Sequence, residues 1–302
     1  MSTPLVGIDL GGTKVEAAIV FPNAPDRAAF RTRLPTESHL GYEHIVSQIK
    51  QLTDLVRAEL GPQFPVCVGI GTPGTLDPKT QLLRGSNTQC LNRRPLKADL
   101  ESAIGVEFAM ANDANCFALA EATLGAARGY ETVFGAILGT GCGGGLVVHQ
   151  KVLNGCHGIA GEWGQIVLEP EGELSGYGTR GIIETMLPGP ALEKFYAKRS
   201  GVHRPLREVV ERARAGNDPD AIATIDRLKT AFARSITVII NAFDPHAIVI
   251  GGGVGNIDEL YAPDVREMIS EQIFAPSFEA PILKPQLGDS AGVFGAAMLT
   301  AE

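Results

Sequence analysis

Two glycine-rich segments of this chain contain the residue types that bind phosphate groups. The first, Gly7-Ile8-Asp9-Leu10-Gly11-Gly12-Thr13-Lys14, joins two apolar stretches and combines a carboxylate with two adjacent glycines. Glycine has no Cβ and tolerates positive φ, so backbone N–H groups at such a bend can close around a phosphate. An ordinary β-hairpin turn has the same pattern. The first segment alone therefore leaves both interpretations open.

A second segment with the same organisation favours the phosphate interpretation. It runs from Gly135 to Gly145 and aligns with the first, so that Gly7, Leu10, Gly11 and Val20 match Gly135, Leu138, Gly139 and Val148. Two such hairpins predict two related lobes. The spacing Gly139-x-Gly141-x-x-Gly144 also fits the dinucleotide-binding fingerprint, but a strand-like stretch follows instead of a helix, so we reject a Rossmann fold.

The elements that would position these segments follow from the apolar periodicity. We expect strands at 4–10, 15–21, 28–34, 65–71, 106–111 and 247–250, a second hairpin at 132–149, and helices at 42–60, 114–124, 219–243 and 291–300. In the helix at 219–243 the expected buried face is Ile222, Ile225, Leu228, Phe232, Ile236, Ile239 and Phe243. Alternating strands and helices of this kind predict an α/β protein.

The composition excludes several classes of protein. The chain has 302 residues, of which 44% are hydrophobic and 20% charged, which predicts two globular domains. Its net charge of −8 argues against nucleic acid as a partner. It has no apolar run near the roughly 20 residues that cross a bilayer and no signal-peptide pattern, so we expect a cytoplasmic protein without membrane contact. Five irregularly spaced cysteines predict no disulfide framework.

Six motifs, in order along nearly the whole chain, resemble those of sugar kinases of the ROK family (repressors, open reading frames, kinases). They are Asp9-Leu10-Gly11-Gly12-Thr13-Lys14, Gly71-Thr72-Pro73-Gly74, Ala111-Asn112-Asp113-Ala114-Asn115, Gly139-Thr140-Gly141-Cys142-Gly143, Gly161-Glu162-Trp163-Gly164 and Gly251-Gly252-Gly253. The resemblance implies a two-lobed actin-like ATPase (ribonuclease H-like) fold with duplicated lobes and a central cleft. The expected lobes are residues 1–113, joined by a C-terminal helix at 290–302, and residues 114–289. A homodimer is implied as well.

Within that family the chain is most similar to bacterial fructokinases, through Asn87-Thr88, Leu91-Asn92 and the Gly-Glu-Trp-Gly motif. The resemblance implies an enzyme that uses ATP and Mg²⁺ to phosphorylate the 6-hydroxyl of a hexose. Fructose is the first candidate, with glucose, mannose and an N-acetylated hexosamine as alternatives. Cys90 stands where fructokinases often have tryptophan, which weakens the case for fructose.

The resemblance also implies roles for individual residues. Asp113 matches the catalytic base that accepts the proton of the attacking sugar hydroxyl, although an aspartate at the start of a helix is also a common N-cap. The implied sugar contacts are Gly74, Thr75, Asn87, Asn112, Asp113, Glu162, Gln165 and Glu184. We expect Trp163 to belong to the core rather than to the sugar site.

For the nucleotide, the resemblance implies that the two hairpin turns lie on opposite sides of the triphosphate. The residues concerned are Gly11, Gly12 and Thr13 in the first turn, and Gly139, Thr140 and Gly141 in the second. Asp9 is the implied partner of Mg²⁺, mostly through water. Lys14 either neutralises phosphate or is only solvated. Gly251, Gly252 and Gly253 match the adenosine site, with a plain strand-to-helix turn as the alternative.

The chain departs from the family where many members hold a structural zinc ion. Gln165 occupies the position of the family histidine, and Ser175–Ile182 replaces a run with three cysteines. These side chains do not substitute for imidazole or thiolate ligands. We therefore expect no structural zinc and a segment at 166–181 that is ordered by packing alone. Near-stoichiometric zinc in protein purified without chelator would contradict this expectation.

Two other classes of protein share the fold. A sugar-responsive repressor needs a helix-turn-helix, and we expect none because the sequence begins directly at the first strand. A catalytically silent sugar-binding protein is disfavoured by Asp113 and by the presence of both hairpins. Release of ADP in a coupled assay would separate an enzyme from a silent protein.

Overall fold

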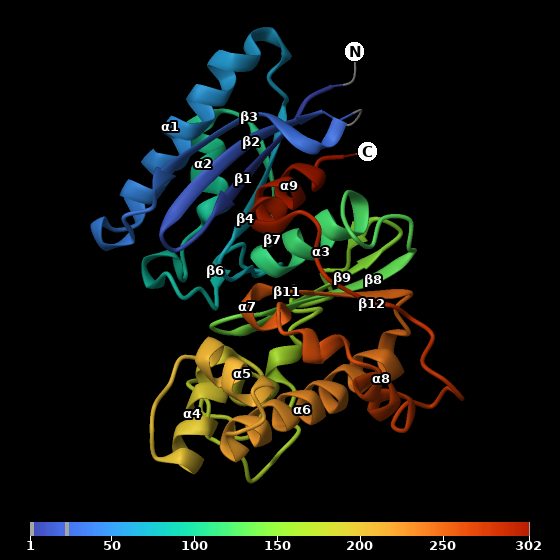
Figure 1. The fold of residues 1–302 in the computed structure, drawn as a ribbon. Helices are drawn as coiled ribbons and strands as arrows, with labels where there is room; N and C mark the ends of the chain where they lie inside the picture. The colour runs from blue at the N-terminus through green and yellow to red at the C-terminus, as the bar shows by residue number, and fades with distance from the viewer. Residues whose placement is uncertain (1–2, 22–23, 302) are drawn as a thin grey trace. The chain divides into compact units, whose positions relative to one another are not determined.

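The computed structural model describes residues 3–21 and 24–301 (Figure 1). A first five-stranded sheet has the order β3-β2-β1-β4-β7. Strands β1, β2 and β3 pair antiparallel, whereas β1, β4 and β7 run parallel. The strands are β1 (Leu5–Leu10), β2 (Lys14–Phe21), β3 (Ala24–Pro35), β4 (Cys67–Thr72) and β7 (Glu107–Asn112), and a separate ribbon pairs β5 (Thr75–Leu76) with β6 (Leu83–Arg84).

The second sheet repeats this plan with the order β10-β9-β8-β11-β12. Its strands are β8 (Thr132–Leu138), β9 (Cys142–Val148), β10 (Lys151–Val152), β11 (Ala247–Gly251) and β12 (Ile282–Leu283). Here β9 and β10 pair antiparallel, and β8, β11 and β12 run parallel. Each glycine-rich hairpin thus occupies the same place in its own sheet, which confirms the repeat that the sequence predicts. Gly144 lies within β9, so no helix follows the Gly139-x-Gly141-x-x-Gly144 spacing, as the rejection of a Rossmann fold requires.

The helices agree with the sequence where the periodicity is long. They are α1 (Tyr42–Leu60), α2 (Leu96–Ile104), α3 (Asp113–Thr123), α4 (Gly189–Ser200), α5 (Leu206–Arg214), α6 (Pro219–Phe243), α7 (Gly252–Gly255), α8 (Pro263–Ser270) and α9 (Ala291–Met298). Helices α1 and α6 have the predicted bounds. The predicted buried face of α6 is wrong at Ile222 and Phe243, which are exposed at the two ends of the helix. Among the described residues, no helix combines the length and the apolar content that crossing a bilayer requires.

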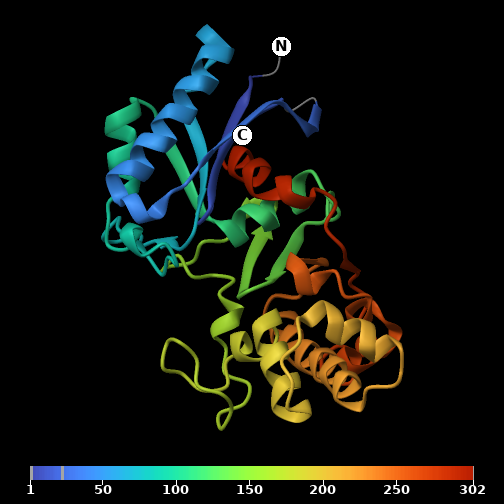
Figure 2. The ribbon, with the colours of Figure 1, turned by 60° about the vertical axis from the view of Figure 1, so that its left-hand side comes forward.

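The chain divides into two compact units. One comprises residues 1–131, 145–160 and 286–302, and the other residues 132–144 and 161–285. This division differs from the boundary at residue 113 that we expected, because α3 packs against α9 and contacts β4 and β7. The termini of the expected lobes, Met1 and Glu302, lie outside the described residues. In the other unit, α4, α5 and α6 pack on one another and are coloured yellow to orange in Figure 2.

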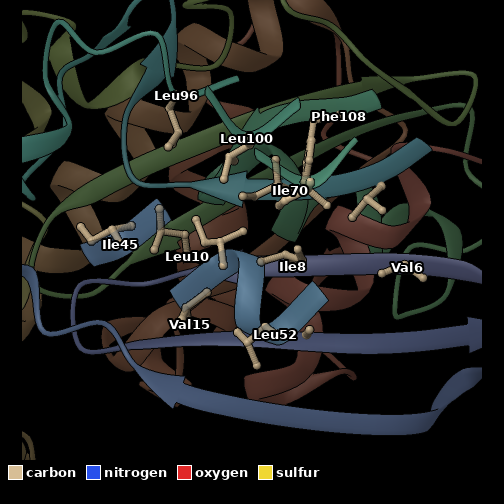
Figure 3. Close-up of a cluster of buried hydrophobic side chains, with 14 of the residues drawn as sticks. Val6, Ile8, Leu10, Val15, Ile45, Leu52, Ile70, Leu96, Leu100 and Phe108 are labelled. Atoms are coloured by element: carbon tan, nitrogen blue, oxygen red, sulfur yellow. The ribbon is translucent and has the colours of Figure 1, made fainter. Parts of the chain in front are cut away.

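The core of the first unit follows from the alternation of side chains along its strands. Val6, Ile8 and Leu10 of β1 point into a buried cluster with Ile45 and Leu52 of α1 (Figure 3). The intervening positions of β1 lie on the opposite face, where α9 packs. At Gly7 a Cβ atom would lie 2.1 Å from the carbonyl oxygen of Val293, so only glycine admits the helix this close.

Candidate active site

Three parallel strands of the first unit bring the expected catalytic residues to one edge of the sheet. Asp9 of β1 is in register with Gly71 of β4, and Gly71 is in register with Ala111 of β7. The chain then leaves β7 through Asn112 into α3. Ligands of open α/β sheets bind beyond the carboxyl ends of such strands. Asp9, the first hairpin turn and Asp113 therefore share the edge at which a ligand is expected.

The first hairpin turn is held by its own backbone and by Thr36. The N–H of Gly11 donates to the carbonyl of Lys14 at 2.9 Å, and the buried Thr36 hydroxyl donates to the carbonyl of Gly11 at 2.7 Å. Gly12 and Thr13 at the tip are exposed. Neither Gly11 nor Gly12 has a positive φ. The glycines leave the tip of the turn without side chains, and a Cβ at Gly12 would meet nothing closer than 4.0 Å.

Lys14 has a partner in the structure. Its Nζ lies 3.3 Å from the carboxylate of Glu16, a residue only 2% exposed that also pairs with Arg31. Burial alone would raise the pKa of Glu16, but hydrogen bonds and charges of Arg31 and Lys14 outweigh it and hold this pKa below its usual range. Lys14 is thus paired with Glu16 while its side chain stays 41% exposed, and a role toward phosphate stays a prediction.

Asp113 is the first residue of α3, but it does not cap the helix. The N-cap is Asn112, whose side-chain oxygen accepts from the N–H of Asn115 at 2.8 Å. The Asp113 carboxylate accepts from the adjacent N–H of Ala114 at 2.8 Å. Asp113 as a whole residue is exposed to solvent. The surrounding protein nevertheless desolvates its carboxylate and raises the pKa of Asp113, and the hydrogen bond from the Ala114 N–H partly offsets this rise. Helix capping therefore does not account for Asp113.

Asp9 is electrostatically coupled to Asp113. Its pKa is raised from 3.8 to about 6, chiefly by burial and then by the negative charges of Asp113 and Glu16. A carboxylate whose charge is disfavoured in this way gains from a cation beside it. The pair therefore forms an acidic centre at the edge where β1 and β7 end.

The loop that contains Asn87 lies beside the first hairpin turn. The tip of that turn is close to Thr88, since the 4.0 Å contact of a Cβ at Gly12 would be with the Thr88 hydroxyl. Asn92 fixes the loop from within: its side-chain amide donates to the carbonyl of Ser86 at 2.8 Å and accepts from the Ser86 N–H at 2.9 Å. Asn87 itself is exposed.

Gly74, which precedes Thr75 of β5, is required by backbone geometry. Its φ is +87°, and a Cβ there would lie 2.5 Å from the carbonyl oxygen of Arg84. The same close approach brings Thr75 next to the loop at 84–92. The first unit thus gathers Gly74, Thr75 and Asn87 around the first hairpin turn.

In the second unit, the two expected glutamates gather around the other hairpin turn. The backbone N–H of Cys142 donates to the Glu184 carboxylate, whose pKa burial raises. Burial and then the charges of Glu184 and Glu162 raise the pKa of the Cys142 thiol, so both carboxylates lie close to it. Gln165 follows in a short 3-10 helix, Trp163–Gln165, and is exposed.

Trp163 belongs to the core, as expected. It is 1% exposed, its indole N–H donates to the carbonyl of Gly143 at 2.8 Å, and its ring meets Phe134 edge-on with centroids 5.4 Å apart. It thereby anchors Glu162 beside the second hairpin. No contact of its ring with a ligand is needed to explain its burial.

A cavity of about 690 Å³ in the second unit is lined by residues of two predicted nucleotide segments. Its lining includes Gly139 and Thr140 of the hairpin turn and Gly253 of α7. Gly252 beside it has φ +81°, and a Cβ there would lie 2.3 Å from the carbonyl oxygen of Leu138. The remaining lining residues are Gly189, Pro190, Glu193, Pro205, Leu206, Arg207, Val210, Glu211, Arg214, Val254, Asn256 and Ile257.

Most of these lining residues were missed at the sequence level because they belong to α4 and α5 or lie beside them. The apolar pair Leu206 and Val210 lies four residues apart on α5, which is the spacing of one helix face. The segment is only nine residues long and strongly charged. The apolar face of α5 is therefore only a weak indication, in the sequence, that this helix lines the cavity.

The segment that replaces the zinc-binding run is not ordered by packing alone, so that expectation is wrong. Glu169 pairs with Arg227 at 3.4 Å and Arg234 at 3.6 Å, both on α6. Glu173 pairs with Lys194 and Lys198 on α4, which holds the pKa of Glu173 at about 2. In the part of the chain that the structure describes, no group of three or more His, Cys, Asp or Glu residues has the arrangement of a metal site.

Comparison with known proteins supplies relatives over almost the whole chain. A sequence model of the ROK family matches residues 5–302. The N-acetyl-D-glucosamine kinase of Haemophilus influenzae is 35% identical over 304 residues, which cover 97% of this chain and 98% of that protein.

Solved structures give the same result. The ROK hexokinase of Thermus thermophilus is 32% identical with a TM-score of 0.83, covering 98% of this chain and 97% of that one. A ROK family glucokinase from Streptomyces griseus, solved in complex with glucose and AMPPNP, is 28% identical with a TM-score of 0.77 and covers 98% of both chains. These neighbours have the actin-like ATPase fold.

Proposed function

Because this chain belongs to the ROK family, we propose that it is a sugar kinase that transfers the γ-phosphoryl group of ATP to the 6-hydroxyl of a hexose. The observation that carries the proposal is that the Asp113 carboxylate does not cap its helix. Asn112 caps α3 in its place, and the Asp113 carboxylate remains at the sheet edge, coupled to Asp9. An aspartate with only a structural role at the start of a helix would itself be the N-cap.

In the proposed reaction Asp113 is the general base. The sugar oxygen forms a bond to the γ-phosphorus while the bond to the β,γ-bridging oxygen breaks, ADP leaves, and the hydroxyl proton passes to the Asp113 carboxylate. A raised pKa suits this role, because a base works best when its pKa approaches the working pH. Such assistance contributes about 10²–10⁴-fold, and orientation of the two reactants supplies more of the rate.

The proposed nucleotide contacts comprise one set of residues in each unit. Gly11, Gly12 and Thr13 offer an exposed turn for phosphate, and Gly139 and Thr140 line the cavity together with Gly253. The apolar residues Leu206, Val210 and Ile257 suit the faces of a purine. The complex of the Streptomyces griseus relative with AMPPNP supports ATP as the donor.

Asp9 fits a role toward Mg²⁺, which would neutralise charge on the phosphates when bound. Its ionisation is opposed by Asp113 and Glu16, and a nearby cation relieves that repulsion. Mg²⁺ keeps several water ligands and needs few protein carboxylates. One partly buried aspartate at the phosphate-binding edge is therefore sufficient.

For the sugar, we place N-acetylglucosamine ahead of fructose. The Haemophilus influenzae relative and one from Aliivibrio salmonicida, each 35% identical to this chain, are named N-acetyl-D-glucosamine kinases. The proposed sugar contacts are Gly74, Thr75, Asn87, Asn112 and Asp113 of the first unit and Glu162, Gln165 and Glu184 of the second. The homodimer and the cytoplasmic location stay predictions.

A substrate panel tests both the reaction and the sugar. N-acetylglucosamine, fructose, glucose and mannose are each supplied with Mg-ATP, and ADP release is followed to obtain kcat/KM. We expect the highest value for N-acetylglucosamine. A higher value for fructose would reverse the order of substrates, and ADP release with none of the four sugars would contradict hexose kinase activity.

Blocking the cavity beside the second hairpin should weaken ATP binding selectively. Gly253 lines the cavity, and a Cβ there meets nothing within 4 Å. A leucine side chain at Gly253 therefore occupies space meant for the nucleotide, and we expect Gly253→Leu to raise KM for ATP at least about tenfold. The melting temperature and KM for the sugar should stay near those of the unchanged protein.

Gly176→Leu is the matched control for this prediction. Gly176 also has nothing within 4 Å of its Cβ position, but it lines a different cavity, of about 570 Å³, under the segment that replaces the zinc-binding run. KM for ATP should be unchanged in this variant. Equal effects of the two substitutions would refute the assignment of the 690 Å³ cavity to the nucleotide.

A further inference from the structure

Helix α9, from the far end of the sequence, packs directly on the backbone of the strands and helix that present the two catalytic-site carboxylates (Figure 1). A Cβ at Gly69 of β4 would lie 1.7 Å from the carbonyl oxygen of Ala296. A Cβ at Gly295 of α9 would lie 1.8 Å from the carbonyl oxygen of Cys116 in α3. At these glycines the backbone of α9 lies directly against the backbone of β1, β4 and α3. Because no flexible side chain lies between them, the position of α9 relative to these elements is fixed.

At its first turn α9 meets the side chain of Asp9. A Cβ at Gly292 would lie 2.6 Å from Oδ2 of Asp9 and 2.9 Å from its Cγ. On the other side, a Cβ at Gly71 of β4 would lie 3.6 Å from Oδ1 of Asp9. The Asp9 carboxylate thus occupies a slot between two glycines that belong to different elements.

The backbone does not explain why residue 292 is glycine. Gly292 lies within α9 and its φ is outside the left-handed region. Glycine is a poorer helix former than alanine, and the alanines of α9 show that small side chains suit this helix. The contact with Asp9 is what a Cβ at this position would disturb.

We propose that Gly292 is a positioning residue of the kinase site, which acts by leaving room for the Asp9 carboxylate between α9 and β4. This inference rests on the proposed function. A methyl group at residue 292 would push Asp9 away from the edge where β1 and β7 end. Displacement of a positioned group by about 1 Å can cost on the order of 100-fold in rate.

Gly292→Ala separates positioning from stability. Its added methyl group meets the end of a side chain that can turn aside, so the fold should be retained. Gly295→Ala is the structural comparison, because its methyl group meets the rigid carbonyl of Cys116 instead. We expect Gly295→Ala to lower the melting temperature clearly and Gly292→Ala to leave it almost unchanged.

Nucleotide binding without turnover is the decisive measurement. In calorimetric titrations, Gly292→Ala should bind ADP in the presence of Mg²⁺ at least about tenfold more weakly than the unchanged protein. Its affinity for ADP without metal and its KM for the sugar should be unchanged. Unaltered binding of Mg-ADP, or an equal loss with and without the metal, would overturn the proposal.

A double-variant cycle tests whether Gly292 acts through Asp9. Adding Gly292→Ala to Asp9→Ala should cause no further loss of Mg-ADP affinity, because the side chain that the methyl group displaces is gone. Additive losses would overturn the proposal. Failure of the proposed function is distinguishable from this outcome, since it appears in the unchanged protein as the absence of sugar-dependent ADP release.

Discussion

Replacement of Asp113 by asparagine is expected to lower kcat by at least about 100-fold while KM for the sugar changes little. Asparagine keeps the shape of the side chain and can still accept a hydrogen bond from Ala114, but it cannot take a proton from the sugar hydroxyl. Because Asn112 provides the helix cap, the fold should be retained. Steady-state kinetics with Mg-ATP and a thermal melt measure both quantities.

Asp264→Asn is the matched control for that experiment. Asp264 lies in the first turn of α8, and its carboxylate accepts from the N–H of the next residue, Val265, at 2.9 Å, as Asp113 accepts from Ala114. The control removes a carboxylate that has the same backbone hydrogen bond, also pairs with Lys229 and does not belong to the proposed site residues, so kcat should not change. Near-normal turnover of Asp113→Asn would refute the role of Asp113 as base.

Replacement of Asp9 by asparagine is expected to reduce activity and increase stability at once. The pKa of Asp9 is raised from 3.8 to about 6 in the folded protein. The folded state therefore holds the Asp9 proton more tightly than the unfolded state, and ionisation of Asp9 costs stability progressively as the pH rises from about 4 to about 6. This cost amounts to at most about 3 kcal/mol.

Urea unfolding of both proteins at pH 4 and pH 7.5 measures this effect. The free energy of unfolding of Asp9→Asn should exceed that of the unchanged protein by more at pH 7.5 than at pH 4. The activity of Asp9→Asn at pH 7.5 should fall at least about tenfold, because the amide does not attract Mg²⁺ as a carboxylate does. A stability difference that is the same at both pH values would contradict the raised pKa.

The sequence predicted those parts of the fold that depend on long or repeated local patterns. Both hairpins were recognised from their matching glycines, and α1 and α6 from apolar residues that recur over five or more turns. Helix α5 has only nine residues and many charged side chains, so its apolar face is a weak indication in the sequence. It was therefore missed, and with it the wall of the 690 Å³ cavity.

At the candidate site, residue types were predictable but contacts between distant segments were not. Adjacent Asn112 and Asp113 are both good capping residues, and only the backbone conformation decides that Asn112 caps α3. The ion pairs of Glu169 and Glu173 with α4 and α6 depend on how those elements pack. For the same reason nothing in the sequence reveals that Gly292 adjoins Asp9.

The interpretation as a fructokinase relied on short motifs that the structure explains in part by local architecture. Asn92 closes its loop onto Ser86 through two hydrogen bonds. The thiol of Cys90 in the same loop lies 3.6 Å from the carbonyl oxygen of Ser38. Residues that shape a loop can recur in kinases of different specificity, so these motifs indicate the form of the loop better than they indicate the sugar.

The packing of α9 against β1 and β4 has a consequence for biosynthesis. Strand β1 ends at Leu10, whereas α9, the helix that covers one face of its sheet, begins only at Ala291, so β1 leaves the ribosome long before α9 is made. At about 5–20 residues per second, the delay is on the order of tens of seconds. During this interval we expect the nascent chain to expose the glycine-lined face of that sheet, a surface that chaperones can bind before α9 covers it.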